Sequence, residues 1–195
     1  MQIKVTLIRS GITKSGAGCR YIGATDEPLC DEGIRLLKSK KQEGCYPEPA
    51  RVYASGQKRC IETAKLLYDG QFIFLAEGFS PYDYGEFEGK TYAEIGQDPR
   101  FLNWALGEAG RLPGADDPYP ARYGAVAAFE RIMTECAEGE VGSAVIVTHR
   151  SVILAIMRER CTPRLAYGHI TLEHGGGVSL TYDACTKSLC VETLF

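Results

Sequence analysis

The sequence predicts an α/β fold, arranged as a three-layer α/β/α sandwich around a mostly parallel sheet. Short apolar runs rich in β-branched residues alternate along the chain with segments whose apolar residues recur at helical spacing. Helices between strands are the usual connection in a parallel sheet, because the chain must return to the same edge before the next strand. At 195 residues the chain has the length of one domain, and we expect one domain over 1–195 with a capping segment at about 77–120.

The elements before this segment follow from local patterns. Residues 3–8 are apolar and mostly β-branched, which is typical of a short buried strand, and residues 51–54 and 72–75 are similar runs. Residues 31–41 space their apolar side chains as a helix does and collect lysines toward their end, where the helix dipole favours them. Residues 57–68 place four apolar side chains on one helical face.

The expected capping segment interrupts this alternation. It contains seven glycines and five prolines among short helical pieces at 92–95 and 101–106. Long irregular connections of this kind are commonly functional loops that cover a site.

The pattern of strand and helix returns after the capping segment. Residues 121–137 and 151–159 have helical spacing, and residues 144–148 form the strongest strand pattern of the chain. Residues 178–182 and 189–195 alternate apolar and polar side chains and predict a terminal hairpin.

Composition excludes several classes of protein. Apolar residues make up 45% and charged residues 24%, as in an ordinary globular protein, and no apolar run is long enough to cross a membrane. The balance of 22 basic and 25 acidic residues, net charge −3, argues against nucleic acid as a partner. The chain starts directly with a strand pattern and not with a leader, so we expect a cytoplasmic protein with no membrane partner.

The eight cysteines are scattered and include no CxxC pair. We therefore expect reduced thiols and no metal site, because a structural zinc site needs clustered ligands. Cys185 and Cys190 flank the turn of the expected hairpin and are the only pair that we expect could approach each other.

Polar residues follow three of the strands at the point where each strand ends. Arg9, Ser10 and Gly11 leave the first strand, Arg59 follows the second, and His149 follows the strand at 144–148. In open α/β sheets ligands bind beyond the carboxyl ends of the strands. Guanidinium groups match phosphate oxygens, glycine lets backbone approach closely, and helix N-termini favour anions. The sequence therefore predicts an anion pocket.

Five segments carry a resemblance to a known family. They are Leu7–Thr13 (Leu-Ile-Arg-Ser-Gly-Ile-Thr), Tyr21–Gly33, Ser55–Ala64, Gly85–Gly89 and Val147–His149. In this order they resemble the motifs of the histidine phosphatase superfamily, the phosphoglycerate mutase-like proteins. The chain length and the stretch Glu-Gly-Lys-Thr-Tyr at 88–92 look most like its α-ribazole phosphatase branch.

The resemblance implies a phosphoglycerate mutase-like fold and hydrolysis of a phosphomonoester without metal or cofactor. A motif histidine attacks phosphorus, two arginines and a second histidine hold the phosphoryl oxygens, and a carboxylic acid protonates the leaving group. Arg9, Arg59 and His149 match the holding residues, with Gly11 beside them. The further residues that we expect to contact substrate are Thr13, Tyr21, Ser55 and Arg150. The implied partner is a small phosphorylated metabolite, such as α-ribazole 5′-phosphate, or inorganic phosphate.

The sequence departs from the family where bonds are broken. Ser10 stands at the nucleophile position, Pro81 at the usual acid position, and Gly16 where the family often has Asn. Arg150-Ser151 replaces the Gly-Gly that usually follows the second histidine. A serine nucleophile would need a base, for which His149 is a candidate. We expect catalysis to be impaired.

Three nearby carboxylates are candidates for a replacement acid. Asp83 is the residue we select, with Glu86 and Glu88 as alternatives, although all three are also typical of solvated loop residues. Two functions stay open at this point. The chain is either a degraded phosphatase or a phospho-ligand binding module without turnover, and Ser10 is either natural or an engineered nucleophile replacement.

Two further histidines lie near the end of the chain, in a segment that holds a run of three glycines. We interpret this segment, with His169 and His174, as a turn that leads into the final hairpin. Either histidine could also line the pocket.

Overall fold

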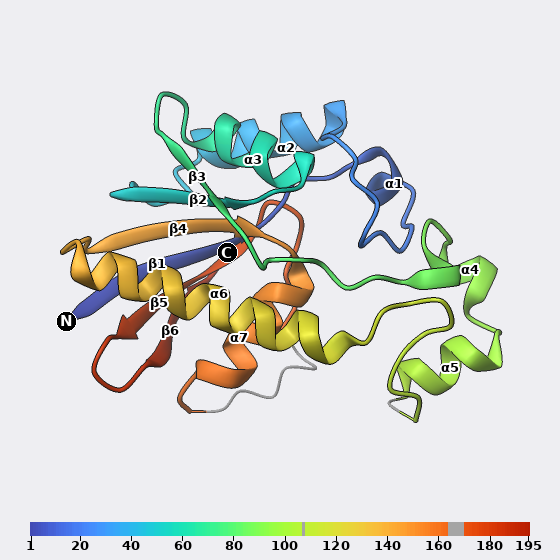
Figure 1. Cartoon of the computed structure of the whole chain (residues 1–195). Helices are drawn as coiled ribbons and strands as arrows, with labels where there is room; N and C mark the ends of the chain where they lie inside the picture. The colour runs from blue at the N-terminus through green and yellow to red at the C-terminus, as the bar shows by residue number, and fades with distance from the viewer. Residues whose placement is uncertain (107, 164–169) are drawn as a thin grey trace.

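A computed structural model describes residues 1–106, 108–163 and 170–195. Within them, six strands form one mixed sheet in the order β3-β2-β4-β1-β5-β6 (Figure 1). The pairings among β3, β2, β4 and β1 are parallel, whereas β5 and β6 add an antiparallel hairpin beside β1. The strands are β1 (Gln2–Arg9), β2 (Arg51–Ser55), β3 (Ile73–Ala76), β4 (Ser143–Thr148), β5 (Gly177–Asp183) and β6 (Ser188–Leu194).

Helices cover both faces of the sheet, which confirms the predicted α/β fold. Helices α2 and α3 lie on one face and α6 and α7 on the other (Figure 1). The helical elements are α1 (Lys14–Ala17), α2 (Asp31–Gln42), α3 (Lys58–Leu67), the 3-10 helix η1 (Gly85–Phe87), α4 (Tyr92–Ile95), α5 (Pro99–Ala105), α6 (Pro118–Glu138) and α7 (Arg150–Arg160).

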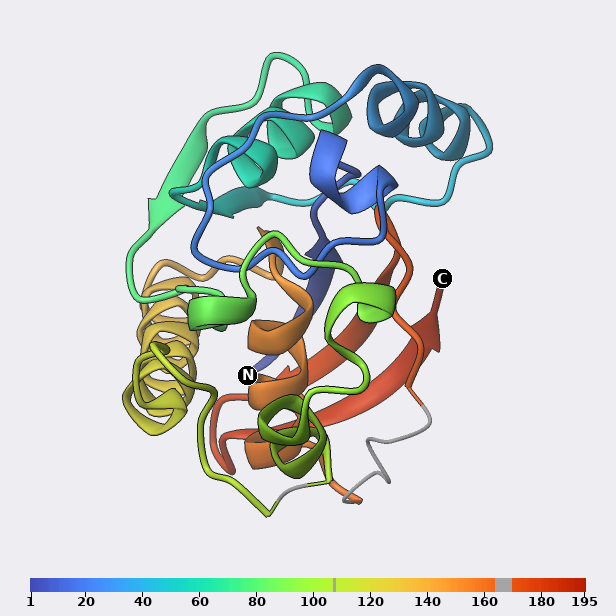
Figure 2. The same ribbon diagram turned by 90° about the vertical axis from the view of Figure 1, so that its right-hand side faces the viewer.

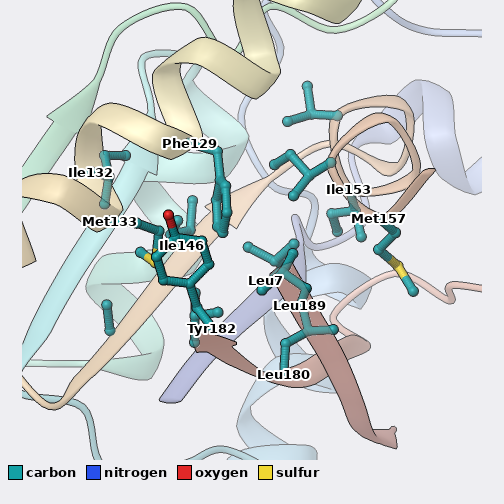
Figure 3. Close-up of a cluster of buried hydrophobic side chains, with 14 of the residues drawn as sticks. Leu7, Phe129, Ile132, Met133, Ile146, Ile153, Met157, Leu180, Tyr182 and Leu189 are labelled. Carbon is teal, nitrogen blue, oxygen red and sulfur yellow. The ribbon is translucent and has the colours of Figure 1, made fainter. Parts of the chain in front are cut away.

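The strands in the middle of the sheet are buried on both faces. In β1, Val5 and Leu7 pack toward α6 and α7, while Ile8 packs toward α2 and α3. Successive side chains of a strand point to opposite faces, so the nearly continuous apolar run of β1 supplies both layers. Figure 3 shows the larger layer, in which Phe129 of α6 and Ile153 of α7 lie over the sheet. This packing fixes the strand ends from which the site is built.

Helix α6 begins three residues earlier than the sequence predicts, at Pro118 rather than at residue 121. The side chain of Asp117 caps the helix by accepting a hydrogen bond from the N–H of Tyr119 at 2.9 Å. Prolines are tolerated in a first helical turn, because those N–H groups have no partner within the helix. Pro118 and Pro120 therefore belong to the helix and not to the preceding irregular segment.

The segment between β3 and α6 has a small apolar cluster of its own. Phe87, Ile95, Phe101 and Leu112 are buried in it, with Tyr21 packed against them. Figure 2 views the molecule from the side on which α1, α4 and α5 lie in Figure 1, where this segment crosses in front of the sheet. The segment is thereby held at the same side as the carboxyl end of β1.

Two observations bear on the wider sequence predictions. No helix in the described ranges is long and apolar enough to cross a membrane. All eight cysteines lie within these ranges as free thiols, including Cys185 and Cys190.

Candidate active site

A cavity of about 140 Å³ lies where β1 and β4 end and α7 begins. Four residues that the sequence analysis selected, Arg9, Ser10, Arg59 and His149, are among its lining residues. No acidic residue is among the described residues of this lining. The full described lining is Arg9, Ser10, Ile22, Arg59, Pro81, Tyr82, Tyr84, His149, Arg150, Ser151 and His174.

Arg9 is held at the cavity by a fixed pair of contacts. Its Nη1 donates to the carbonyl oxygen of Leu172 at 2.6 Å, and its Nη2 donates to Nε2 of His174 at 2.6 Å. Burial, followed by the nearby charge of Arg150, lowers the pKa of Arg9 to about 10. The group is still cationic at neutral pH.

Arg59 is only 4% exposed and is anchored by backbone. Its guanidinium donates to the carbonyl oxygens of Thr25 at 2.8 Å and Gly23 at 2.9 Å. Burial lowers the pKa of Arg59 below its usual value. Among the described residues neither Arg59 nor Arg9 has a carboxylate within ion-pair distance. One buried cation, Arg59, and one half-buried cation, Arg9, without a carboxylate partner make the cavity favourable for an anion.

His149 is neutral and has a defined tautomer. The hydroxyl of Ser55 donates to the carbonyl oxygen of Phe79 at 3.0 Å, so its contact of 2.9 Å with Nε2 of His149 requires an N–H on that nitrogen. The other ring nitrogen, Nδ1, then accepts from Nη2 of Arg59 at 3.3 Å. Burial, followed by the charge of Arg59, lowers the pKa of His149 to about 3.

Ser10 is 3% exposed, and its backbone N–H donates to the carbonyl oxygen of Thr148 at 2.9 Å. Its side chain hydrogen-bonds the thiol of Cys60, a contact that lowers the pKa of that thiol against the larger raising effect of burial. Both ring nitrogens of His149 already have partners, so this histidine is not placed to deprotonate Ser10. The geometry gives the serine no activated hydroxyl.

The carboxylates of the three candidate acids already have protein partners. Asp83 accepts a hydrogen bond from the N–H of Gly85 at 2.8 Å and is absent from the described cavity lining. Glu86 pairs with Arg100 at 3.0 Å. Glu88 accepts from three backbone N–H groups, those of Gly23, Thr25 and Tyr84.

Position 81 does line the cavity. Pro81 has no side-chain proton to give to a leaving group.

The remaining predicted residues divide into two groups. Arg150, the first residue of α7, lines the cavity and is exposed. Gly11 and Thr13 lie outside its described lining. The N–H of Gly11 donates to Thr63 Oγ1, and a Cβ at Gly11 would lie 2.7 Å from Cδ1 of Leu37, so close packing and not ligand approach requires this glycine.

Thr13, Tyr21 and Ser55 have structural partners. Thr13 caps α1 by accepting from the N–H of Gly16 at 3.1 Å. The ring of Tyr21 packs edge-on against Tyr84 at 5.2 Å between centroids. Ser55 holds His149 as described above, so it acts behind the cavity wall rather than in it.

His174 lines the cavity, which the sequence analysis left open as an alternative to a purely structural turn. Its position follows from long-range contacts of the neighbouring glycine. The N–H of Gly175 donates to the carbonyl oxygen of Arg9 at 3.0 Å, and its own carbonyl accepts from the hydroxyl of Tyr46 at 2.7 Å. The run of glycines at 175–177 was the only local signal, because it permits this close approach to β1. His169 lies outside the described residues.

A second cavity of about 370 Å³ adjoins the first and shares Tyr82, Tyr84, Arg150 and Ser151 with it. Tyr82 and Trp104 stack with ring centroids 5.5 Å apart. Arg158 and Arg122, which pairs with Glu159, also line this cavity. The described lining is Ser80, Tyr82, Tyr84, Trp104, Ala121, Arg122, Ala125, Arg150, Ser151, Val152, Leu154, Ala155 and Arg158.

The fold and the cavity define an α/β protein with a cation-lined cavity at the carboxyl ends of its strands. The family model of the histidine phosphatase superfamily (branch 1) matches residues 5–190. The chain therefore belongs to the histidine phosphatase superfamily. A sequence search of curated proteins gave no significant match.

Solved structures agree with the fold over nearly the whole chain. An α-ribazole phosphatase of Shigella flexneri has a TM-score of 0.79 at 16% identity, covering 98% of this chain and 96% of that one. A phosphoglycerate mutase of Bacillus anthracis has a TM-score of 0.78 at 19% identity, covering 98% and 92%. A phosphoserine phosphatase of Entamoeba histolytica, in complex with 3-phosphoglyceric acid, has a TM-score of 0.75 at 21% identity, covering 98% and 96%. At identities this low, the structural similarity shows a common phosphoglycerate mutase-like fold and not a shared activity.

Proposed function

We propose that this chain binds phosphomonoesters in the cavity lined by Arg9, Arg59 and His149, and that hydrolysis through position 10 is impaired. The observation that supports it most is the pair of cavity-lining guanidinium groups, buried in Arg59 and half-buried in Arg9, without a carboxylate partner among the described residues. A dianionic phosphoryl group supplies the missing counter-charge and can accept hydrogen bonds from both arginines. Membership of the superfamily makes phosphomonoester hydrolysis the ancestral reaction.

The organic part of the ligand is proposed to lie in the adjoining cavity, which residues of the segment between β3 and α6 partly line. The stacked rings of Tyr82 and Trp104 suit an apolar or planar group. Arg150 and Arg158 form no ion pair within the described part of the chain, so a second negative charge on the ligand is favoured there. The expected cytoplasmic location, and the expected lack of nucleic-acid or membrane partners, stay predictions.

A binding module without turnover is the second candidate. Two observations favour it: no base is positioned to deprotonate Ser10, and Pro81 at the cavity wall cannot protonate a leaving group. Turnover of a simple phosphomonoester distinguishes the two functions.

Thermal unfolding with inorganic phosphate or vanadate tests the proposed binding. Millimolar anion should raise the Tm, because a ligand bound only by the folded state stabilises it. Arg9→Ala and Arg59→Ala should abolish the shift. Arg9→Lys and Arg59→Lys should weaken it, since lysine keeps the charge but loses the planar fork. Arg35→Ala, an exposed change on α2 with the same loss of charge, is the matched control. A full shift in both alanine variants, with native circular dichroism, would contradict the proposed site.

The adjoining cavity has its own test. An aryl phosphate with a ring carboxylate should raise the Tm more than the uncharged analogue, and Arg158→Ala should remove the difference. If the two aryl phosphates raised the Tm of the unmodified protein equally, the result would argue against a second anionic group on the ligand.

A further inference from the structure

The imidazole of His174 is oriented with one nitrogen toward the cavity and the other toward backbone. Nδ1 lies 3.1 Å from the carbonyl oxygen of Ser10, which can only accept, so Nδ1 has the hydrogen. Nε2 is 2.6 Å from Nη2 of Arg9, which can only donate. His174 therefore presents the lone pair of Nε2 beside a guanidinium group of the proposed phosphate site.

The space for this ring is provided by two small residues at positions where the family resemblance implies larger ones. A Cβ at Gly16 would lie 3.6 Å from Nε2 of His174, so the Asn often found in the family would extend toward the ring. Position 10 is Ser rather than the motif histidine, and its side chain turns to Cys60. Ser10, Gly16 and His174 thus form one arrangement, in which a second imidazole occupies the region next to Arg9.

His174 and His149 both have a partner at each ring nitrogen, but they differ in burial. His149 is 5% exposed, and its N–H and its lone pair have protein partners from two elements, Ser55 and Arg59. His174 is half-buried and lines the cavity, and its Nε2 contacts Arg9, a group that a bound phosphoryl oxygen would engage. Burial and the charge of Arg9 lower the pKa of His174 to about 4, so the ring is unprotonated at neutral pH.

We propose that His174 is the nucleophile of this chain, attacking in place of the residue at position 10 a phosphoryl group held by Arg9 and Arg59. This inference rests on the proposed phosphate site. The bond from Nε2 to phosphorus forms as the bond from phosphorus to the leaving oxygen breaks. The leaving oxygen departs with the electron pair and takes a proton from water. Water then attacks phosphorus, the electron pair returns to Nε2, and inorganic phosphate is released with the ring neutral.

The lining explains which substrates this route accepts. Pro81 leaves no acid at the usual position, so the first step depends on a leaving group that is stable as an anion. Acyl phosphates and aryl phosphates meet this condition, and alkyl phosphates do not.

Acetyl phosphate is the probe for the experiment. The full chain is incubated with it, quenched in alkali to preserve phosphohistidine, and mapped by peptide mass spectrometry, while phosphate release is followed in parallel. We expect a phosphoryl group on His174, or acetyl phosphate hydrolysis that depends on it. His174→Asn keeps a donor near the carbonyl of Ser10 but removes Nε2, and should reduce both signals to background. Ser39→Ala, an exposed change on α2, should keep them.

Two results would overturn this assignment and leave the proposed binding site standing. The first is a label on Ser10. The second is neither label nor hydrolysis in protein that phosphate stabilises against heat. If phosphate fails to raise the Tm of the unmodified protein, the proposed function itself fails, and the thermal measurement separates that case from the other two.

Discussion

Ser55 and His149 form a buried pair in which Oγ lies 2.9 Å from Nε2, and the hydroxyl proton of Ser55 is directed to the carbonyl oxygen of Phe79. The serine comes from the end of β2 and the histidine from the end of β4, two strands that are paired in parallel. This contact determines which nitrogen of His149 has the hydrogen. It also turns the lone pair of Nδ1 toward Arg59 and away from any role as the base for Ser10.

Ser55→Ala should lower the free energy of unfolding by about 1–3 kcal/mol, because it leaves the buried N–H of His149 without a partner. Urea denaturation with an unchanged m-value measures this loss. Ser39→Ala on the exposed face of α2 is the control and should have little effect. If Ser55→Ala and Ser39→Ala changed the free energy of unfolding by the same small amount, the Ser55 contact would not hold His149.

Stability should fall as pH drops from about 6.5 toward 4. Burial lowers the pKa of His149 to about 3 and of His174 to about 4, from a reference value of 6.5. Between these values the unfolded chain binds protons that the folded chain does not, so acid favours unfolding, and above pH 6.5 these groups add no further change. The Tm measured from pH 7.5 to 5 tests this, and His174→Asn should flatten the profile. A profile that is flat in the unmodified protein would contradict buried neutral histidines.

Gly23→Ala should destabilise the fold by about 3 kcal/mol and abolish anion binding. A Cβ there would lie 1.6 Å from the carbonyl oxygen of Tyr82, and the carbonyl of Gly23 itself anchors Arg59. Gly56→Ala is a close control, because a Cβ at Gly56 meets no atom within 4 Å. Chemical denaturation and the phosphate-induced Tm shift measure the two effects. A Gly23→Ala protein with the full shift would mean that this loop does not position Arg59.

The sequence predicted the strands and helices well because each has a clear period of its own. Parallel strands must also bring their carboxyl ends to one edge, so the convergence of Arg9, Arg59 and His149 followed from the order of elements. His174 could not be predicted in this way. Its place depends on Gly175, whose contacts with Arg9 and Tyr46 are far apart along the chain.

The roles of the loop carboxylates were also beyond sequence reasoning. A carboxylate near the usual acid position is a candidate acid until its partners are known. Asp83 and Glu88 accept backbone N–H groups, which only the folded loop specifies. The start of α6 was misplaced for a local reason, since prolines in the first turn conceal a helix that Asp117 caps.

In a Ser10→His background, Pro81→Glu should reduce the ratio of kcat/KM for an aryl phosphate to kcat/KM for an alkyl phosphate. Pro81 lines the cavity, so a glutamate there could protonate a poor leaving group, with a gain of roughly 10²–10⁴-fold for the alkyl ester. The ratio of kcat/KM for p-nitrophenyl phosphate and a simple alkyl phosphate, with and without Pro81→Glu, measures it. An unchanged ratio would show that position 81 does not reach the leaving group.

In the proposed function, the phosphate-holding groups are in place while the residue at position 10 does not attack. Steady-state hydrolysis of p-nitrophenyl phosphate by the unmodified protein, Ser10→Ala and Ser10→His tests it most directly. We predict the same turnover for the unmodified protein and Ser10→Ala, and a clear gain for Ser10→His, because Arg9, Arg59 and His149 already surround the cavity. Turnover of an alkyl phosphate by the unmodified protein at about 1 s⁻¹ or more, lost in Ser10→Ala, would contradict it.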